Sequence, residues 1–116
     1  MPRHDPLVRL RHMLDYAREA VDMAASRTRV QLQQERMFAL ALTRCVAVID
    51  EAGRRVDTDI QARYPEIPWG DITGMHDRLV HDYDVIDFKL LWDTVTVDLP
   101  PLIEQLERIL AEEDAD

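Results

Sequence analysis

The sequence predicts an all-α protein, an up-down bundle of four main helices plus one short helix. Two observations predict this fold class. Hydrophobic residues recur at alternating spacings of three and four along most of the chain, which is the period of an α-helix. There are only three glycines, and the six prolines stand near the ends of the periodic segments. A chain of 116 residues is expected to form one domain over 1–116, with fraying at 1–4 and 112–116.

The first two expected helices span about residues 5–25 and 30–56, separated by a turn at 26–29. Asp5 followed by Pro6 is a typical helix start, because aspartate caps the free N–H groups and proline tolerates the first helical position. The centre of the second helix, from Met37 to Ile49, is apolar on nearly every side. A helix of this kind is buried on every side. In so small a domain that burial requires a second subunit, so we expect a homodimer.

The short helix is expected at 57–64, where Pro65 and Pro68 would end it. The third main helix then runs to about Tyr83. Residues three and four apart lie on one helical face, so Arg78 and His81 are expected to share a face.

The last main helix begins near Asp87 and reaches about residue 111. Its segment 94–99 alternates with period two, which is typical of a strand. We favour a helix because the helical stripe continues on both sides. Pro100 and Pro101 predict a kink or a restart there, with Asp98 as a local cap.

The net charge is 14 − 23 = −9, and it is unevenly distributed. Residues 1–50 carry 8 arginines and 6 acids, whereas residues 51–116 carry 6 cations and 17 acids. So acidic a chain binds nucleic acid poorly through its overall charge. Contact with RNA would need a local basic patch or arginines from a second subunit. Of the 14 cations 13 are arginine, which reflects either a GC-rich genome or phosphate recognition by guanidinium groups.

Several classes of protein receive no support from the sequence. The single Cys45 cannot form an internal disulfide, and neither a signal-peptide core nor a membrane-length apolar run is present, so we expect a cytoplasmic protein. Metal-ligand spacings, glycine-rich phosphate loops and nucleophile elbows are missing too, so no metal or cofactor is expected.

The segment GMHDRLVHDYDVID, residues 74–87, gathers the residues best suited to chemistry. Histidine exchanges protons near neutral pH, and His76 and His81 stand beside Arg78 and Tyr83. Composition alone favours a polar helix end over a phosphate-handling site. The other candidates have simpler interpretations: His4 and His12 as solvated side chains, Trp69 and Trp92 as core residues.

The stretch GMHDRLVHDYDVIDFKLLWDTVTVDLPPLIEQL resembles the C-terminal half of the HepT-like family, in the HEPN superfamily of small α-helical ribonucleases. That family carries R-x4-H-x-Y, here ending in His81 and Tyr83. RCVAVIDEAGRRV resembles the family segment I-x-G-E-A-x-R, and YPEIPW resembles P-x-I-P-W. The likeness covers about residues 5–110, with one departure: the motif arginine falls on His76. The matching residues from 74 onward are Gly74, Met75, Asp77, Leu79, His81, Tyr83, Ile86, Asp87, Trp92, Asp93, Val95, Asp98, Leu99 and Pro100.

The resemblance implies a metal-independent endoribonuclease toxin of a type VII toxin–antitoxin system, acting on tRNA or mRNA as a homodimer. Its antitoxin would be an MNT-type nucleotidyltransferase that silences the toxin by transferring AMP onto Tyr83. His81 would be the general base or acid at a ribose 2′-OH, and Asp77 would orient the pair. A protonated His76 or Arg78 would replace the missing arginine. The alternative is a catalytically weakened HEPN dimer that binds the nucleotidyltransferase. A helical dimerisation bundle without a site is the third interpretation.

Overall fold

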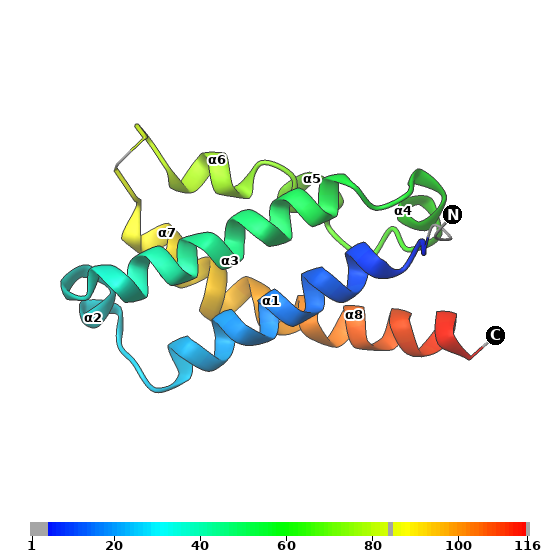
Figure 1. Cartoon of the computed structure of the whole chain (residues 1–116), viewed down its shortest axis with the longest axis horizontal. Helices are drawn as coiled ribbons and strands as arrows, with labels where there is room; N and C mark the ends of the chain where they lie inside the picture. Colours follow the sequence, from blue (N-terminus) through cyan, green and yellow to red (C-terminus); the bar gives the residue numbers. More distant parts are fainter. Residues whose placement is uncertain (1–4, 84, 116) are drawn as a thin grey trace.

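The computed structural model describes residues 5–83 and 85–115, which form four helical passes running up and down the long axis of the molecule (Figure 1). The all-α prediction is confirmed: the described residues contain helices and one isolated β-bridge. The elements are α1 (Val8–Ala25), α2 (Arg29–Gln34), α3 (Arg36–Arg54), α4 (Thr58–Arg63), α5 (Trp69–Ile72), α6 (Met75–Leu79), α7 (Phe88–Asp93), the π-helical turn η1 (Thr94–Asp98) and α8 (Leu99–Asp114).

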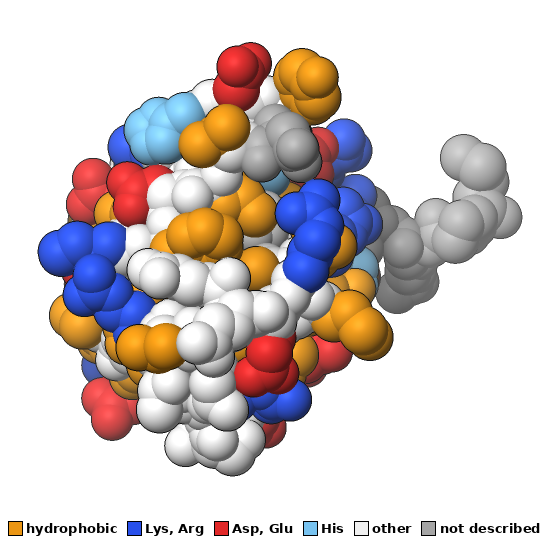
Figure 2. Space-filling model, turned by 90° about the vertical axis from the view of Figure 1, so that its left-hand side faces the viewer, with side chains coloured by type: hydrophobic (Ala, Val, Ile, Leu, Met, Phe, Trp, Pro, Cys, Tyr) orange, Lys and Arg blue, Asp and Glu red, His pale blue; other side chains and the backbone are white. Residues whose placement is uncertain are grey.

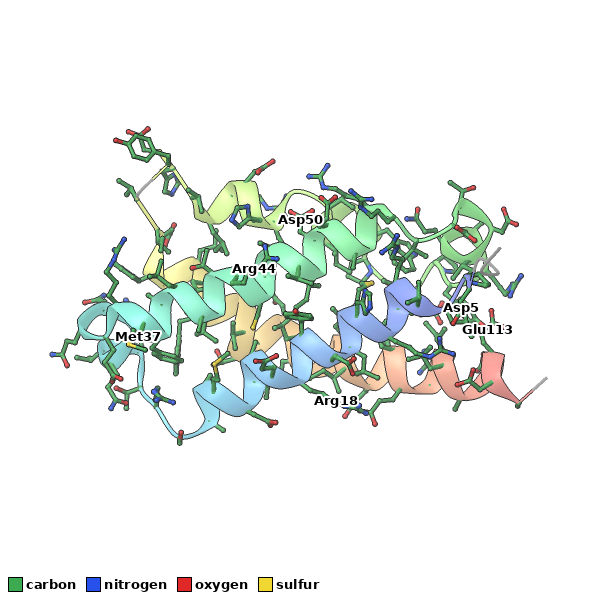
Figure 3. All side chains as sticks on the ribbon, in the orientation of Figure 1. Asp5, Arg18, Met37, Arg44, Asp50 and Glu113 are labelled. Carbon is green, nitrogen blue, oxygen red and sulfur yellow. The ribbon has the colours of Figure 1, made fainter. Side chains whose placement is uncertain are left out.

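Helix α1 forms the centre of the bundle and packs along both α3 and α8 (Figure 1). Its apolar stripe is fully buried at Leu10, Met13 and Ala17, as the sequence period predicts. The start of α1 is tied to the end of α8, because Arg11 forms ion pairs with Asp5 at 2.6 Å and with Asp114 at 3.4 Å. Figure 3 labels Asp5 and Glu113 at this end of the molecule.

The expected second helix is divided into α2 and α3 at Glu35, whose backbone is extended. Helix α2 starts at Arg29 because Thr28 and Gln31 form a capping box, with hydrogen bonds of 3.3 and 2.7 Å. Part of the apolar surface of α3 remains exposed in the single chain. Met37 is 85% exposed and Leu40 is 47% exposed.

The expected third helix is also divided, and its predicted extension to Tyr83 is wrong. Gly74 separates α5 from α6 with a left-handed backbone, φ 101°, and α6 ends at Leu79. The chain then reverses direction. Val80 and Ile86 form an antiparallel bridge, and the His81 N–H donates to the Val85 carbonyl at 2.9 Å.

The last pass is helical throughout, so the helix favoured over the strand at 94–99 is confirmed. The expected restart at the two prolines takes the form of a π-helical turn, in which the Leu99 N–H donates to the Thr94 carbonyl. Asp98 makes no cap hydrogen bond, since the helix continues through it and leaves no new end to cap. Helix α8 extends to Asp114, so it includes residues 112–114, for which fraying is expected. The expectations for 1–4, His4 and Asp116 lie outside the described residues.

The short helix α4 lies where it was expected, before Pro65. Trp69 and Trp92 are half-buried against the core, and Cys45 is buried. His12 is exposed. In the part of the chain that the structure describes, no helix is long and apolar enough to cross a membrane.

Candidate functional site

The structure distributes the residues of segment 74–87 over three places. His76 and Asp77 line a hollow between α6 and α3. Arg78 lines a groove on the other side, between α5–α6 and the last pass. His81 and Tyr83 lie in the chain reversal after α6. The expectation that Arg78 and His81 share a helical face is wrong, because the helix ends between them.

Asp50 on α3 holds the start of α6 in place. Its side chain is 5% exposed, and one carboxylate oxygen accepts the N–H groups of Gly74 and His76, each at 3.1 Å. The other oxygen accepts Arg54 Nε at 2.7 Å. Burial by itself raises the pKa of Asp50, but the Arg54 hydrogen bond and the two backbone N–H groups together lower it below its ordinary value. Asp50 is therefore an ionised clamp between α3 and α6.

Sequence reasoning missed Asp50 and Arg54. The available signal was an aspartate at the end of an apolar run, with an arginine one helical turn later. When Glu51 and Ala52 are placed on the E-A of I-x-G-E-A-x-R, the glycine of that segment falls on Asp50 and its arginine on Arg54. Asp50 and His76 are thus both departures from the family pattern, and they are in direct contact.

The hollow beside this clamp has a volume of about 490 Å³, and polar side chains from α3 and α6 surround it. Arg54 Nη2 lies 3.9 Å from an Asp77 carboxylate oxygen, and His76 Nδ1 lies 4.0 Å from the other. Arg44 completes the cationic lining. Figure 3 shows Arg44 and Asp50 following one another along α3. The carboxylates of Asp50, Glu51 and Asp77 line the same hollow, so its formal charge is 2 − 3 = −1 and Arg54 is already held by Asp50. A phosphate in this hollow would therefore be bound by Arg44, and the imidazole of His76 could carry a proton there.

Arg78 is engaged elsewhere. Its guanidinium donates a hydrogen bond to the carbonyl of Asp71. The groove that it lines has a volume of about 660 Å³ and is largely apolar, with Met75, Leu90 and Leu99 among its walls.

His81 stands at the surface, with its side chain 62% exposed, and its Nε2 lies 3.6 Å from an Asp87 carboxylate oxygen. Asp87 is fixed in turn, because its other oxygen caps α7 by accepting the Leu90 N–H at 3.0 Å. The hydrogen bond from the Leu90 N–H lowers the pKa of Asp87, and the neighbouring His81 lowers it further. A carboxylate beside the imidazole can orient it for proton transfer. The expected orienting residue, Asp77, lies instead beside His76.

Tyr83 is 96% exposed, so its hydroxyl is open to another protein. No group of three or more His, Cys, Asp and Glu side chains within residues 5–83 and 85–115 is arranged to hold a metal ion.

The all-α bundle, with an exposed histidine after its third pass, is consistent with a HEPN-type helical domain. Residues 13–109 match the family model described as Ribonuclease HepT-like, and the chain therefore belongs to the HepT-like ribonuclease family.

Curated relatives agree with this assignment. "Putative RNase MJ1216" of Methanocaldococcus jannaschii is 28% identical over 110 residues, which cover 95% of this chain and 91% of the relative. "Probable ribonuclease HepT" of Thermococcus cleftensis is 36% identical over 69 residues, covering 60% of this chain and 63% of the relative. No solved structure matches the chain significantly.

Proposed function

We propose that this protein is a metal-independent endoribonuclease that acts as a toxin in the cytoplasm and cleaves tRNA or mRNA at His81. The observation that carries the proposal is the exposed imidazole of His81, 3.6 Å from Asp87, in a chain of the HepT-like ribonuclease family. The relatives described above are named as ribonucleases, which supports the same substrate class.

In the proposed reaction, neutral His81 accepts the proton of a ribose 2′-OH, and the 2′-oxygen attacks the adjacent phosphorus. The bond from phosphorus to the 5′-oxygen breaks, a proton is returned to that oxygen, and a 2′,3′-cyclic phosphate remains. A positioned general base contributes about 10²–10⁴-fold in rate. No metal is required, because the imidazole supplies the proton transfer.

The negative charge that builds up on the phosphate requires a cation. Protonated His76 and Arg78 are the two candidates from the motif. Arg78 already donates to the Asp71 carbonyl, which favours His76, with Asp77 orienting its ring. Further positive charge can come from a second subunit.

A homodimer is part of the proposal. Exposed apolar side chains lie at the end of the bundle that carries α2, the start of α3 and the chain reversal, and Figure 2, which views this end, shows them separated by polar and charged side chains. They are Val30, Met37, Leu40, Tyr83 and Val85, exposed by 60, 85, 47, 96 and 54%. Pairing through them would cover the apolar surface and bring the two His81 segments together.

The proposed control of the toxin is modification of Tyr83. An MNT-type nucleotidyltransferase would join the phenolic oxygen of Tyr83 to the α-phosphorus of ATP. Pyrophosphate would leave, and the phenolic proton would pass to solvent. The exposure of the phenol, 96%, is what such an enzyme requires. The AMP would then add a phosphate and a base close to His81 and obstruct RNA.

The nuclease proposal is tested by RNA cleavage with purified protein in EDTA. We expect cleavage by wild type, loss of at least about 10²-fold in rate for His81→Ala, and unchanged cleavage for Arg18→Gln, a control on α1. Activity that disappears with EDTA, or that survives His81→Ala, would refute it. If wild type is inactive and His76→Arg cleaves RNA, the second candidate function holds: a weakened HEPN dimer that binds the nucleotidyltransferase. The replacement of the motif arginine by His76 is the observation that favours this candidate.

The modification is tested by intact mass after co-expression with an MNT-type nucleotidyltransferase encoded beside this gene. We expect wild type to gain one or more AMP units and Tyr83→Phe to gain none. An unmodified wild type would support a helical bundle without a site.

A further inference from the structure

We propose that the surface between α1 and α3, formed by Arg9, His12, Arg44 and Arg55, binds the backbone of single-stranded RNA and leads it to the hollow at His76. This inference rests on the proposed ribonuclease function, since it names how the substrate reaches His76, the proposed cation of that reaction.

A second hollow of about 210 Å³ lies between α1 and α3, and these four side chains are part of its lining. It adjoins the hollow at α6, because Arg44, Ala47 and Glu51 line both. Positions 44, 47 and 51 of α3 are three or four residues apart and lie on one helical face, and Arg55 follows four residues later as the C-cap of the helix. Together the hollows form one path from α1, across α3, to His76.

The part of this path between α1 and α3 is opposite in charge to the whole molecule, whereas the hollow at His76 carries two arginines and three acids, 2 − 3 = −1. The α1–α3 hollow carries three arginines and one acid, 3 − 1 = +2, in a chain whose net charge is −9. The acid, Glu51, is already paired with Arg55 at 2.7 Å. The side chains of Arg9 and Arg44 make no hydrogen bond or ion pair with another residue that the structure describes. Their guanidinium groups are therefore available to an anion.

A phosphodiester backbone fits this path better than an acidic protein. Guanidinium groups match the oxygen pairs of phosphate, and a row of them along a groove binds successive phosphates. The floor consists of the small or short side chains Ala47, Val48 and Ala52, which leave room for a strand and present no large apolar anchor of the kind protein interfaces use. This is the local basic patch that so acidic a chain needs to bind RNA.

The test is binding of a fluorescent 2′-O-methyl RNA oligonucleotide, which the proposed reaction cannot cleave, over a series of salt concentrations. For single strands each lost phosphate contact lowers the slope of log K against log salt by about 0.7. We expect Arg9→Gln and Arg44→Gln each to lower the slope by this amount and to weaken binding several-fold. Arg44→Lys, which keeps the charge, should retain most of the binding.

Arg18→Gln is the matched control, because it removes the same charge from α1 at a side chain that pairs with Glu107 of α8 at 3.4 Å. Circular dichroism of each variant checks that it is folded. If both Arg9→Gln and Arg44→Gln keep the wild-type salt slope and the wild-type affinity for RNA, the proposed surface is refuted. The proposed RNA surface is also refuted if those variants keep wild-type RNA binding and lose only their binding to the nucleotidyltransferase. If RNA binding weakens in these arginine variants but the wild type cleaves no RNA, the RNA surface is supported and the nuclease proposal is refuted. Failure of the surface and failure of the nuclease proposal are therefore distinguishable.

Discussion

A single buried carboxylate links two positions at which this chain departs from its family pattern. Asp50 stands where the pattern has glycine, His76 stands where it has arginine, and the Asp50 carboxylate accepts the His76 N–H. The same carboxylate holds Arg54, whose guanidinium also faces the hollow. The chain lacks the motif arginine at position 76, but Arg54 on α3 places a guanidinium group in the same hollow.

Asp50→Ala should destabilise the fold by about 2–3 kcal/mol, because it leaves the N–H groups of Gly74 and His76 unsatisfied in a partly buried place. The neighbouring Glu51→Ala removes only an exposed pair with Arg55 and should cost less than about 1 kcal/mol. Urea denaturation of both variants measures the difference. Equal losses would contradict the clamp.

The clamp also predicts a dependence on pH. The pKa of Asp50 is lower in the folded protein than its ordinary value of 3.8, so its contribution is complete above that pH and is lost as pH falls through the folded pKa. The stability gap between wild type and Asp50→Ala should be constant above about pH 5 and shrink below pH 3.8. A gap that widens in acid would exclude this explanation.

At the scale of elements, the third pass departs most from a regular helix. Its two short helices meet at Gly74, the one residue with positive φ in residues 5–83 and 85–115, and this junction turns the start of α6 towards Asp50. The early end of α6 then releases His81 and Tyr83 into the exposed reversal. A continuous helix would have placed His81 on the same face as Arg78.

Gly74→Ala should cost about 1–2 kcal/mol, because a Cβ is unfavourable in the left-handed region. It would also lie 3.3 Å from a guanidinium nitrogen of Arg78. Gly70→Ala is the control: its Cβ meets nothing within 4 Å, and alanine favours α5, so stability should stay within about 1 kcal/mol of wild type. Thermal unfolding of the two variants provides the comparison, and equal midpoints would count against a strained junction.

At the scale of the whole molecule, the apolar end of the bundle predicts association. Met37→Glu should raise the dissociation constant of the homodimer at least about tenfold, since burying an unpaired charge costs more than about 1.4 kcal/mol. Val97→Glu is the control, because Val97 is 63% exposed but lines the groove of the last pass. Light scattering over a dilution series measures both variants. A monomeric wild type, or equal effects of the two substitutions, would argue against this interface.

The sequence by itself determined the class of fold, the four passes, the short α4 and the family. Each of these depends on local signals: the spacing of apolar residues, the prolines and a contiguous motif. Even the conflict at 94–99 was resolved by the stripe on either side, although the π-helical turn was not foreseen.

Only the tertiary structure decided how the candidate site is arranged. The end of α6, the separation of Arg78 from His81 and the pairing of His81 with Asp87 depend on how the third pass meets α3 and α7. The clamp at Asp50 joins residues 24 and 26 positions apart, and the basic path joins α1 to α3. Such contacts have no periodic trace in the chain, because packing between distant segments determines which polar side chains meet.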